Sequence, residues 1–208
     1  MKENRELITL AKRIQALAEN GQHYSESDYD LDRYREMDKI SRQMLGLFTQ
    51  MDIKQIDAII PENNGYRTPK VDVRAVIFNK EGEILMVKEM ADNNWSLPGG
   101  WADVGFTPAE IAEKETFEEA GMKVKAQRIL AVLDKKCWDH PEDLYYAYKI
   151  FIECESLDST LKTGYETSEA GFFGLDKLPE LSEPRNTREQ IKLMFDFRSE
   201  NRNWPYID

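Results

Sequence analysis

One helix of this chain has both of its ends marked in the sequence. In the segment GFTPAEIAEKETFEEAG, Thr107 is a candidate N-cap, with Pro108 at the first helical position. Glu110 follows the cap by three residues and completes a capping box, and Gly121 supplies a left-handed stop. The fold must therefore accommodate a rigid helix of known length between these two ends.

The same helix gathers like charges on one side. Glu115, Glu118 and Glu119 stand at i, i+3 and i+4, where carboxylates repel each other by roughly 0.2–0.5 kcal/mol per pair. Folding tolerates such an arrangement, so either water screens it or a cation belongs there. A stripe of small residues beside the glutamates predicts close packing on a sheet, and it comprises Ala109, Ala112, Thr116 and Ala120.

The amino-terminal part of the chain is predicted to be entirely helical. ENRELITLAKRIQALAEN is expected to end at Gly21, and IKQIDAII stops at Pro61. The segment between them repeats apolar residues at helical spacing, namely Leu31, Tyr34, Met37, Ile40, Met44 and Leu47. Such helices do not easily bury their apolar faces alone, so we expect them to dock on the rest of the protein or on a second copy. The predicted domains are residues 1–62 and 63–208.

The second domain mixes strands with helices. VDVRAVIFNKEGEILMVKE alternates and predicts a hairpin that turns at Lys80 to Gly82. Aliphatic and aromatic runs predict further strands at about 125–134 and 144–155. A last helix is expected after Asn186 or Thr187. The chain is therefore predicted to be α+β.

Composition excludes several classes of protein. A net charge of −11 argues against general nucleic-acid binding, which needs Lys and Arg to neutralise phosphates. The longest apolar runs are far shorter than the ~18 residues of a membrane span, and the charged start MKENRELITL predicts a cytoplasmic protein. Cys137 and Cys154 are interpreted as ordinary reduced cysteines, and His23 and His140 form no motif.

A glycine loop, DNNWSLPGGWADVG, precedes the glutamate-bearing helix, and the combination resembles the Nudix hydrolases. Their signature is G-x5-E-x7-R-E-U-x-E-E-x-G-U, where U is aliphatic. Six of its nine positions match here: Gly100, Glu115, Glu118, Glu119, Gly121 and Met122. Phe106, Lys114 and Thr116 depart from it.

Phe106 precedes the cap residue, and we expect its ring to pack on Ile111 and so replace the family's Glu–Arg pair. Lys114 would then be free to contact substrate phosphate or to neutralise Glu110 or Glu118.

The resemblance implies a Nudix α/β/α sandwich with a mixed sheet, over residues from about 69 to 200, preceded by the helical domain. It also implies a bound Mg²⁺, with Mn²⁺ as a substitute, held by Glu115, Glu118 and Glu119 with Gly99. Hard cations of this kind take oxygen ligands and activate water. The candidates for the general base are Glu166, Glu169 and Glu119 itself. The candidate substrate-binding residues are Arg74, Lys88, Trp95, Gly99, Gly100, Trp101 and Lys135, with Tyr66 and Trp138 as further aromatic groups.

Helices ahead of a Nudix domain resemble the bacterial subgroup that hydrolyses nucleoside diphosphate-X compounds, such as CDP-choline, UDP-linked compounds and ADP-ribose. The resemblance implies a homodimer formed through the amino-terminal helices. It further implies cleavage of the diphosphate bond to a nucleoside monophosphate and phospho-X. The alternatives are a nucleoside triphosphate pyrophosphatase, which would release pyrophosphate, and a degenerate nucleotide-binding module.

Overall fold

The computed structural model describes residues 2–61, 65–200 and 202–208, with residues 2–4 as backbone only, and the chain divides into two compact units. One unit is helical, reaches to Pro69 and includes Glu142–Tyr146 from a distant part of the sequence. The other holds Lys70–Pro141 and Ala147–Asp208. Among the described residues no helix has the length and hydropathy that crossing a membrane requires.

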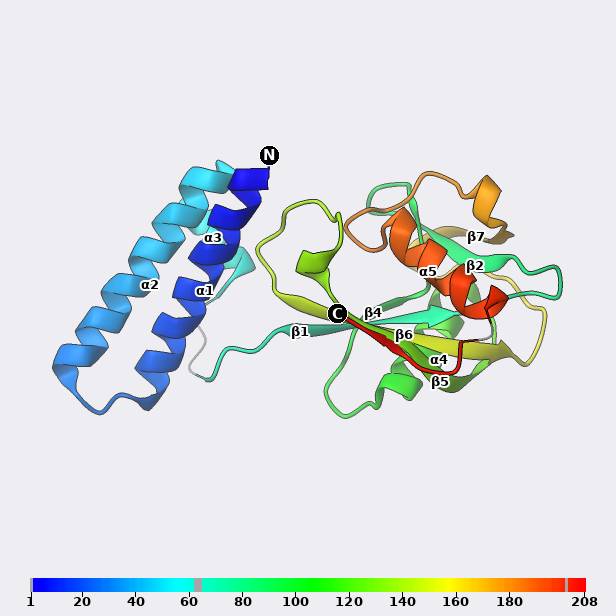
Figure 1. Cartoon of the computed structure of the whole chain (residues 1–208), viewed down its shortest axis with the longest axis horizontal. Helices are drawn as coiled ribbons and strands as arrows, with labels where there is room; N and C mark the ends of the chain where they lie inside the picture. The colour runs from blue at the N-terminus through cyan, green and yellow to red at the C-terminus, as the bar shows by residue number, and fades with distance from the viewer. Residues whose placement is uncertain (1, 62–64, 201) are drawn as a thin grey trace. The chain divides into compact units, whose positions relative to one another are not determined.

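The helical unit contains α1 (Lys2–Tyr24), α2 (Asp28–Thr49) and α3 (Ile53–Ile59) (Figure 1). The predicted end of the first helix at Gly21 is wrong, because α1 continues to Tyr24. A Cβ at Gly21 would lie 2.4 Å from the ring of Tyr34. Gly21 therefore makes room for α2 rather than ending α1.

Side chains of the helices contact the distant segment of this unit. An apolar cluster joins Ile8, Leu45 and Ile56 to Leu144 of the distant segment. The Lys12 ammonium donates to the backbone carbonyls of Asp143 and Tyr145, at 2.9 and 3.1 Å. This anchoring explains why the strand expected at 144–155 begins only at Ala147.

The second unit contains two sheets. One is five-stranded and mixed, in the order β4-β1-β6-β5-β8, and the other is antiparallel, in the order β3-β2-β7. The strands are β1 (Lys70–Val76), β2 (Ile84–Glu89), β3 (Trp95–Ser96), β4 (Gly99–Trp101), β5 (Val124–Asp134), β6 (Ala147–Ser156), β7 (Thr167–Phe173) and β8 (Tyr206–Ile207). Helices α4 (Pro108–Ala120) and α5 (Arg188–Ser199) and the 3₁₀ turns Lys135–Cys137 and Leu175–Lys177 complete it.

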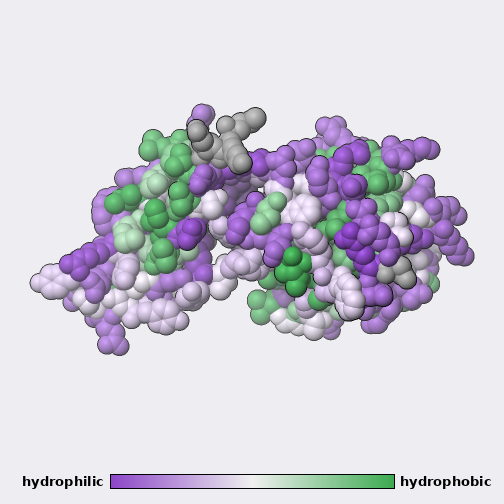
Figure 2. Space-filling view, in the orientation of Figure 1, coloured by the Kyte–Doolittle hydropathy of each residue, from purple (hydrophilic) through white to green (hydrophobic). Residues whose placement is uncertain are grey.

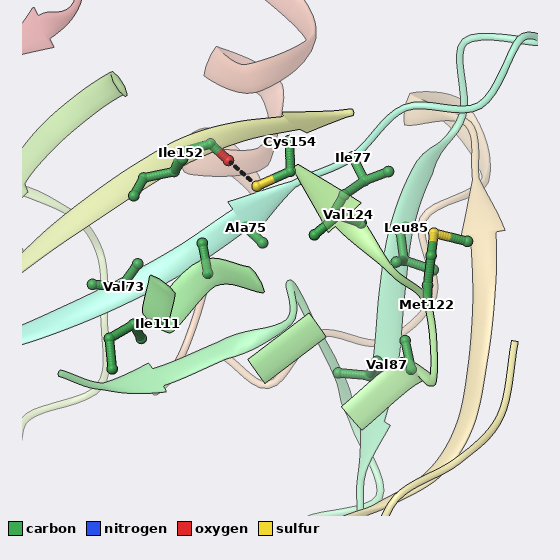
Figure 3. Close-up of a cluster of buried hydrophobic side chains, with 12 residues drawn as sticks. Val73, Ala75, Ile77, Leu85, Val87, Ile111, Met122, Val124, Ile152 and Cys154 are labelled. Carbon is green, nitrogen blue, oxygen red and sulfur yellow. Dashed lines mark hydrogen bonds between the residues drawn. The ribbon is translucent and has the colours of Figure 1, made fainter. Parts of the chain in front are cut away.

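Alternating side chains of β1 and β2 divide the interior into two cores. Val73 and Leu85 belong to a core beneath α4, drawn in Figure 3, whereas Val76 and Met86 belong to a second core beneath α5. A helix therefore covers each side of the strands. The predicted α/β/α sandwich with a mixed sheet, preceded by a helical domain, is confirmed.

The predicted hairpin is correct only at its turn. The Asn79 and Glu83 backbones pair there, and Phe78 bridges Ile84. Beyond the turn the two strands enter different sheets, because β1 pairs with β4 and β6 while β2 pairs with β3 and β7. Both edges of β1 are thus occupied by other strands.

Candidate active site

The glutamate-bearing helix α4 begins and ends where its sequence predicts. The Thr107 side chain accepts from the Glu110 N–H and the Glu110 carboxylate accepts in return, while Gly121 adopts φ 65°. Of the predicted small-residue stripe, Ala112, Thr116 and Ala120 are buried, but Ala109 is exposed because it lies in the first turn. The packed stripe brings the last two turns of α4 close to the sheets.

Two carboxylates of α4 lie against the glycine loop. The Gly99 N–H donates to Glu119 Oε2 at 2.9 Å, and a Cβ at Gly100 would lie 3.5 Å from Glu115 Oε2. Gly99 itself adopts φ +141°, and a Cβ there would approach the Val73 carbonyl oxygen to 2.0 Å. Only glycine permits this close approach of the loop to β1.

Glu119 is an unusual place for a negative charge. Its side chain is buried, and burial raises the pKa of the carboxyl to about 8, although Arg74 and the Gly99 N–H act in the opposite direction. The nearby carboxylates of Glu89 and Glu115 raise the pKa further. Acidic groups that crowd a buried position in this way are favoured when a cation shares the site.

Glu118 is oriented differently from its two neighbours. Its carboxylate is 55% exposed and pairs with Lys114 Nζ at 3.2 Å. Lys114 also contacts Glu115 at 3.1 Å and Asp103 of the glycine loop at 3.4 Å. Hydrogen bonds to Glu115 and Glu118 raise the pKa of the Lys114 ammonium. Within the part of the chain that the structure describes, no three acidic, His or Cys side chains converge as a ready-made metal site.

Asp103 is a residue that the sequence reasoning missed. Through Lys114 it connects the loop to α4, which is the connection that the family's Glu–Arg pair would make. Phe106, the residue at the family's glutamate position, is 49% exposed. Phe106 is also not among the residues of the core that encloses Ile111.

The two candidate bases beyond α4 have different surroundings. Glu169 pairs with Lys88 Nζ at 2.8 Å across neighbouring strands, which commits both side chains to each other. The Glu166 side chain is exposed and makes no hydrogen bond or ion pair with the rest of the described chain. Thr167, next to it, donates to the Glu119 carbonyl oxygen at 2.6 Å. This bond fixes the segment that carries Glu166 to the end of α4.

Arg74 is buried, and its guanidinium is hydrogen-bonded to other groups of the same chain. Its guanidinium bonds both oxygens of Asp72 and the Leu97 carbonyl oxygen, and Asp72 also accepts from Lys149 Nζ at 2.7 Å. Although burial opposes ionisation, Arg74 and Lys149 lower the pKa of Asp72 to about 2. Burial lowers the pKa of Lys149 to about 8. Polar residues alternating within the otherwise apolar VDVRAV were the available signal for Asp72.

The candidate aromatic residues are dispersed. Trp95 packs edge-on against Phe173 at 4.7 Å in the core beneath α5, whereas Trp101 is 45% exposed with Lys70 over its ring. Trp138 donates to Asp208, and Tyr66 belongs to the helical unit, where it meets Tyr24. Lys135 begins the 3₁₀ turn after β5. Of these aromatic groups, Trp101 directly follows Gly99 and Gly100 in the sequence.

Comparison with known proteins agrees with this geometry. A family model described as "NUDIX domain" matches residues 68–197, and one described as "UDP-X-like, N-terminal oligomerisation domain" matches residues 5–60. The candidate ADP-ribose pyrophosphatase YjhB of Bacillus subtilis (strain 168) is 44% identical over 90% of this chain and 89% of its own.

Two solved structures are similar as well. An ADP-ribose pyrophosphatase from Streptococcus suis 89-1591 is 41% identical, with a TM-score of 0.61, over 68% of this chain and all of its own. A UDP-X diphosphatase structure is 31% identical, with a TM-score of 0.64, over 99% of both chains. Sandwich, glycine loop and acidic helix together define a hydrolase of phosphoanhydride bonds. The chain belongs to the Nudix hydrolases, in the subgroup of NDP-X pyrophosphatases that carry an amino-terminal helical domain.

Proposed function

We propose that this enzyme hydrolyses the diphosphate bond of nucleoside diphosphate-X compounds in a Mg²⁺-dependent reaction, giving a nucleoside monophosphate and phospho-X. ADP-ribose and UDP-linked compounds are the first substrates to test, because the similar proteins carry those names. CDP-choline is the next. The single observation that supports the proposal is the pair of carboxylates, Glu115 and Glu119, held beside Gly99 and Gly100.

These residues fit a hard divalent cation. Mg²⁺ is commonly bound by one or two carboxylates, with water and substrate phosphate completing its shell. Glu115 and Glu119 would hold it, and the Gly99 carbonyl is the third candidate ligand. When bound, the ion would neutralise charge on the diphosphate and make water more acidic. Because the Glu118 side chain is 55% exposed, whereas Glu115 is 15% exposed and lies beside Gly100, we assign Glu118 a smaller part than Glu115 and Glu119.

A carboxylate must also accept the proton of the attacking water. Glu166 is the better candidate because its side chain is not engaged elsewhere in the described chain, whereas Glu169 is paired with Lys88. The bond from Thr167 to Glu119 places the backbone next to Glu166 against the end of α4.

We also propose that the enzyme is a homodimer formed by its helical unit. Figure 2 shows hydrophobic residues gathered over this unit. On α1, Leu10, Leu17 and Tyr24 stand seven residues apart and are 43, 63 and 70% exposed. On α2, Ile40 and Leu47 are likewise 44 and 79% exposed. A second copy of the same helices would cover such repeating apolar side chains.

The metal proposal is tested by Glu119→Gln and Glu115→Gln, measured at saturating Mg²⁺ with the best of these substrates. Each removes a charge and keeps size, so the rate should fall at least ~10²-fold. Glu113→Gln is the matched control on the same helix, because Glu113 accepts from the Ala126 N–H and the amide oxygen of Gln can do the same. Full activity of Glu119→Gln would refute the assignment.

A further inference from the structure

The segment between Ser96 and Gly99 is held by side chains rather than by a neighbouring strand alone. The Leu97 N–H donates to Asn186 Oδ1, and the Leu97 carbonyl oxygen accepts from Arg74 Nη1, both at 3.0 Å. Leu97 is fully buried. Both backbone polar groups of this one residue are therefore fixed by side chains from distant parts of the sequence.

The two side chains that hold Leu97 are themselves positioned. Arg74 is oriented by both oxygens of Asp72, and Asp72 in turn accepts from Lys149, so that the three charges are each at most 6% exposed. Asn186 immediately precedes Thr187, the N-cap of α5, and its backbone N–H donates to the Ser182 carbonyl oxygen.

Stability does not explain these residues. Burying three ionic groups costs desolvation energy that their attraction often fails to recover. The Nδ2 of Asn186 is buried without a hydrogen-bond partner in the described chain, which carries a further cost. These buried charges and Asn186 are costly to bury, so the position in which they hold Leu97 explains them better than stability does.

The position of Leu97 affects the active site, because Gly99 follows it by two residues. The Pro98 carbonyl oxygen accepts from the Ala75 N–H, and the Gly99 N–H then donates to Glu119 Oε2. A shift of Leu97 would move the Gly99 donor away from the Glu119 carboxylate.

We infer that Asp72 and Asn186 are positioning residues, which fix Leu97 from opposite ends so that Gly99 orients Glu119 for the cation. The inference rests on the proposed metal-dependent function. It assigns a positioning role to two residues that are not among the proposed ligands of the cation.

The test uses Mn²⁺ binding to the full-length protein, followed by electron paramagnetic resonance of the free ion, without substrate. Asp72→Asn removes the charge that orients Arg74, and Asn186→Leu removes the acceptor for Leu97. Each should weaken Mn²⁺ binding by about 10–100-fold, as loss of groups behind metal ligands typically does. Asn186→Asp keeps the acceptor oxygen and should restore affinity to within a few-fold of wild type.

The control is Leu45→Ala, which truncates a buried side chain in the apolar cluster of the helical unit, whereas Leu97 belongs to the core beneath α5. It should lower the melting temperature and leave Mn²⁺ affinity unchanged. If Asp72→Asn and Asn186→Leu behave like this control, the inference is wrong. Glu119→Gln separates the two claims, because unaltered Mn²⁺ binding in that variant would refute the metal site itself. Loss of binding in Glu119→Gln alone would leave the proposed function standing.

Discussion

Glu166 and Glu169 are three positions apart on one segment, but only Glu169 forms a salt bridge within the described chain. The pairing of Glu169 with Lys88 lowers its availability as a base, whereas the Glu166 carboxylate is exposed. We expect Glu166→Gln to lower kcat by about 10²–10⁴-fold, the usual contribution of general base catalysis. Glu169→Gln, its matched control, should cost less than 10-fold. Equal losses in kcat for the two variants, measured at saturating substrate, would contradict this assignment.

The glycine loop and helix α4 are joined by Lys114, which contacts Asp103, Glu115 and Glu118. Lys114→Met should release the loop and leave the acidic face uncompensated, so we expect a 10–100-fold loss in kcat/KM. Phe106→Ala should change activity less than threefold, because half of that side chain already faces solvent. A larger effect of Phe106→Ala than of Lys114→Met would show that the ring, and not the ion pairs, positions the helix.

His140 joins the segment after β5 to the start of α5. Its Nδ1 lies 2.6 Å from the Glu183 carbonyl oxygen and its Nε2 lies 3.0 Å from Gln190 Nε2, so the neutral ring donates at one nitrogen and accepts at the other. Burial lowers the pKa of His140 from 6.5 to about 4, with Lys149 and Lys135 acting in the same direction and the Glu183 carbonyl and Asp72 opposing.

The unfolded chain therefore binds a proton at His140 between pH 6.5 and 4, where the folded protein does not. This contribution to stability is complete above pH 6.5 and is lost as the pH falls through 4. Between pH 7 and 5 the loss of this contribution should lower the free energy of unfolding by about 2 kcal/mol. His140→Asn should be less stable at pH 7 and should lose about 2 kcal/mol less over that interval in urea titrations. Parallel pH profiles for the two proteins would show that His140 is not responsible.

The whole molecule is expected to assemble through the exposed apolar residues of α1 and α2. Leu17→Glu and Leu47→Glu together should convert the dimer to a monomer in light scattering, because they place charges where a second copy packs. Leu157→Glu is the matched control, since Leu157 is also 63% exposed but lies in the other unit. A wild-type protein that is monomeric at micromolar concentration would refute the dimer, as would an unchanged mass of the double variant.

Much of the fold could be predicted from signals between residues that are close in the sequence. The caps of α4, the strand over Val124–Asp134 and the cap of α5 at Thr187 were predictable because each depends on residues within a few positions. The end of α1 was not, because Gly21 serves a contact with Tyr34 in another helix. The predicted pairing of the two hairpin strands beyond the turn was wrong for a similar reason, since the sequence does not indicate which strands occupy the edges of β1.

The residues of the candidate site could be predicted where they lie within one short motif, but not where the fold brings together distant parts of the sequence. The spacing of Glu115 and Glu119 implied that they share one face, and they lie together at the glycine loop. Helical spacing allowed the pairing of Lys114 with Glu118 as one alternative, whereas the contacts of Lys114 with Glu115 and Asp103 were not predicted. Asp72 and Lys149 meet only through strand register, and Asn186 accepts from Leu97, which is far from it in the sequence, so the sequence reasoning did not find these contacts.

The central claim is cleavage of NDP-X at its diphosphate bond, and product analysis tests it most directly. Purified full-length enzyme should be incubated with ADP-ribose, UDP-linked sugars, CDP-choline and nucleoside triphosphates, each with Mg²⁺ and with chelator. Phosphorus NMR of the best substrate should show one nucleoside monophosphate and one phospho-X per turnover, with no reaction in chelator. Higher kcat/KM for triphosphates with release of pyrophosphate, or no Mg²⁺-dependent turnover of any NDP-X compound, would contradict the account.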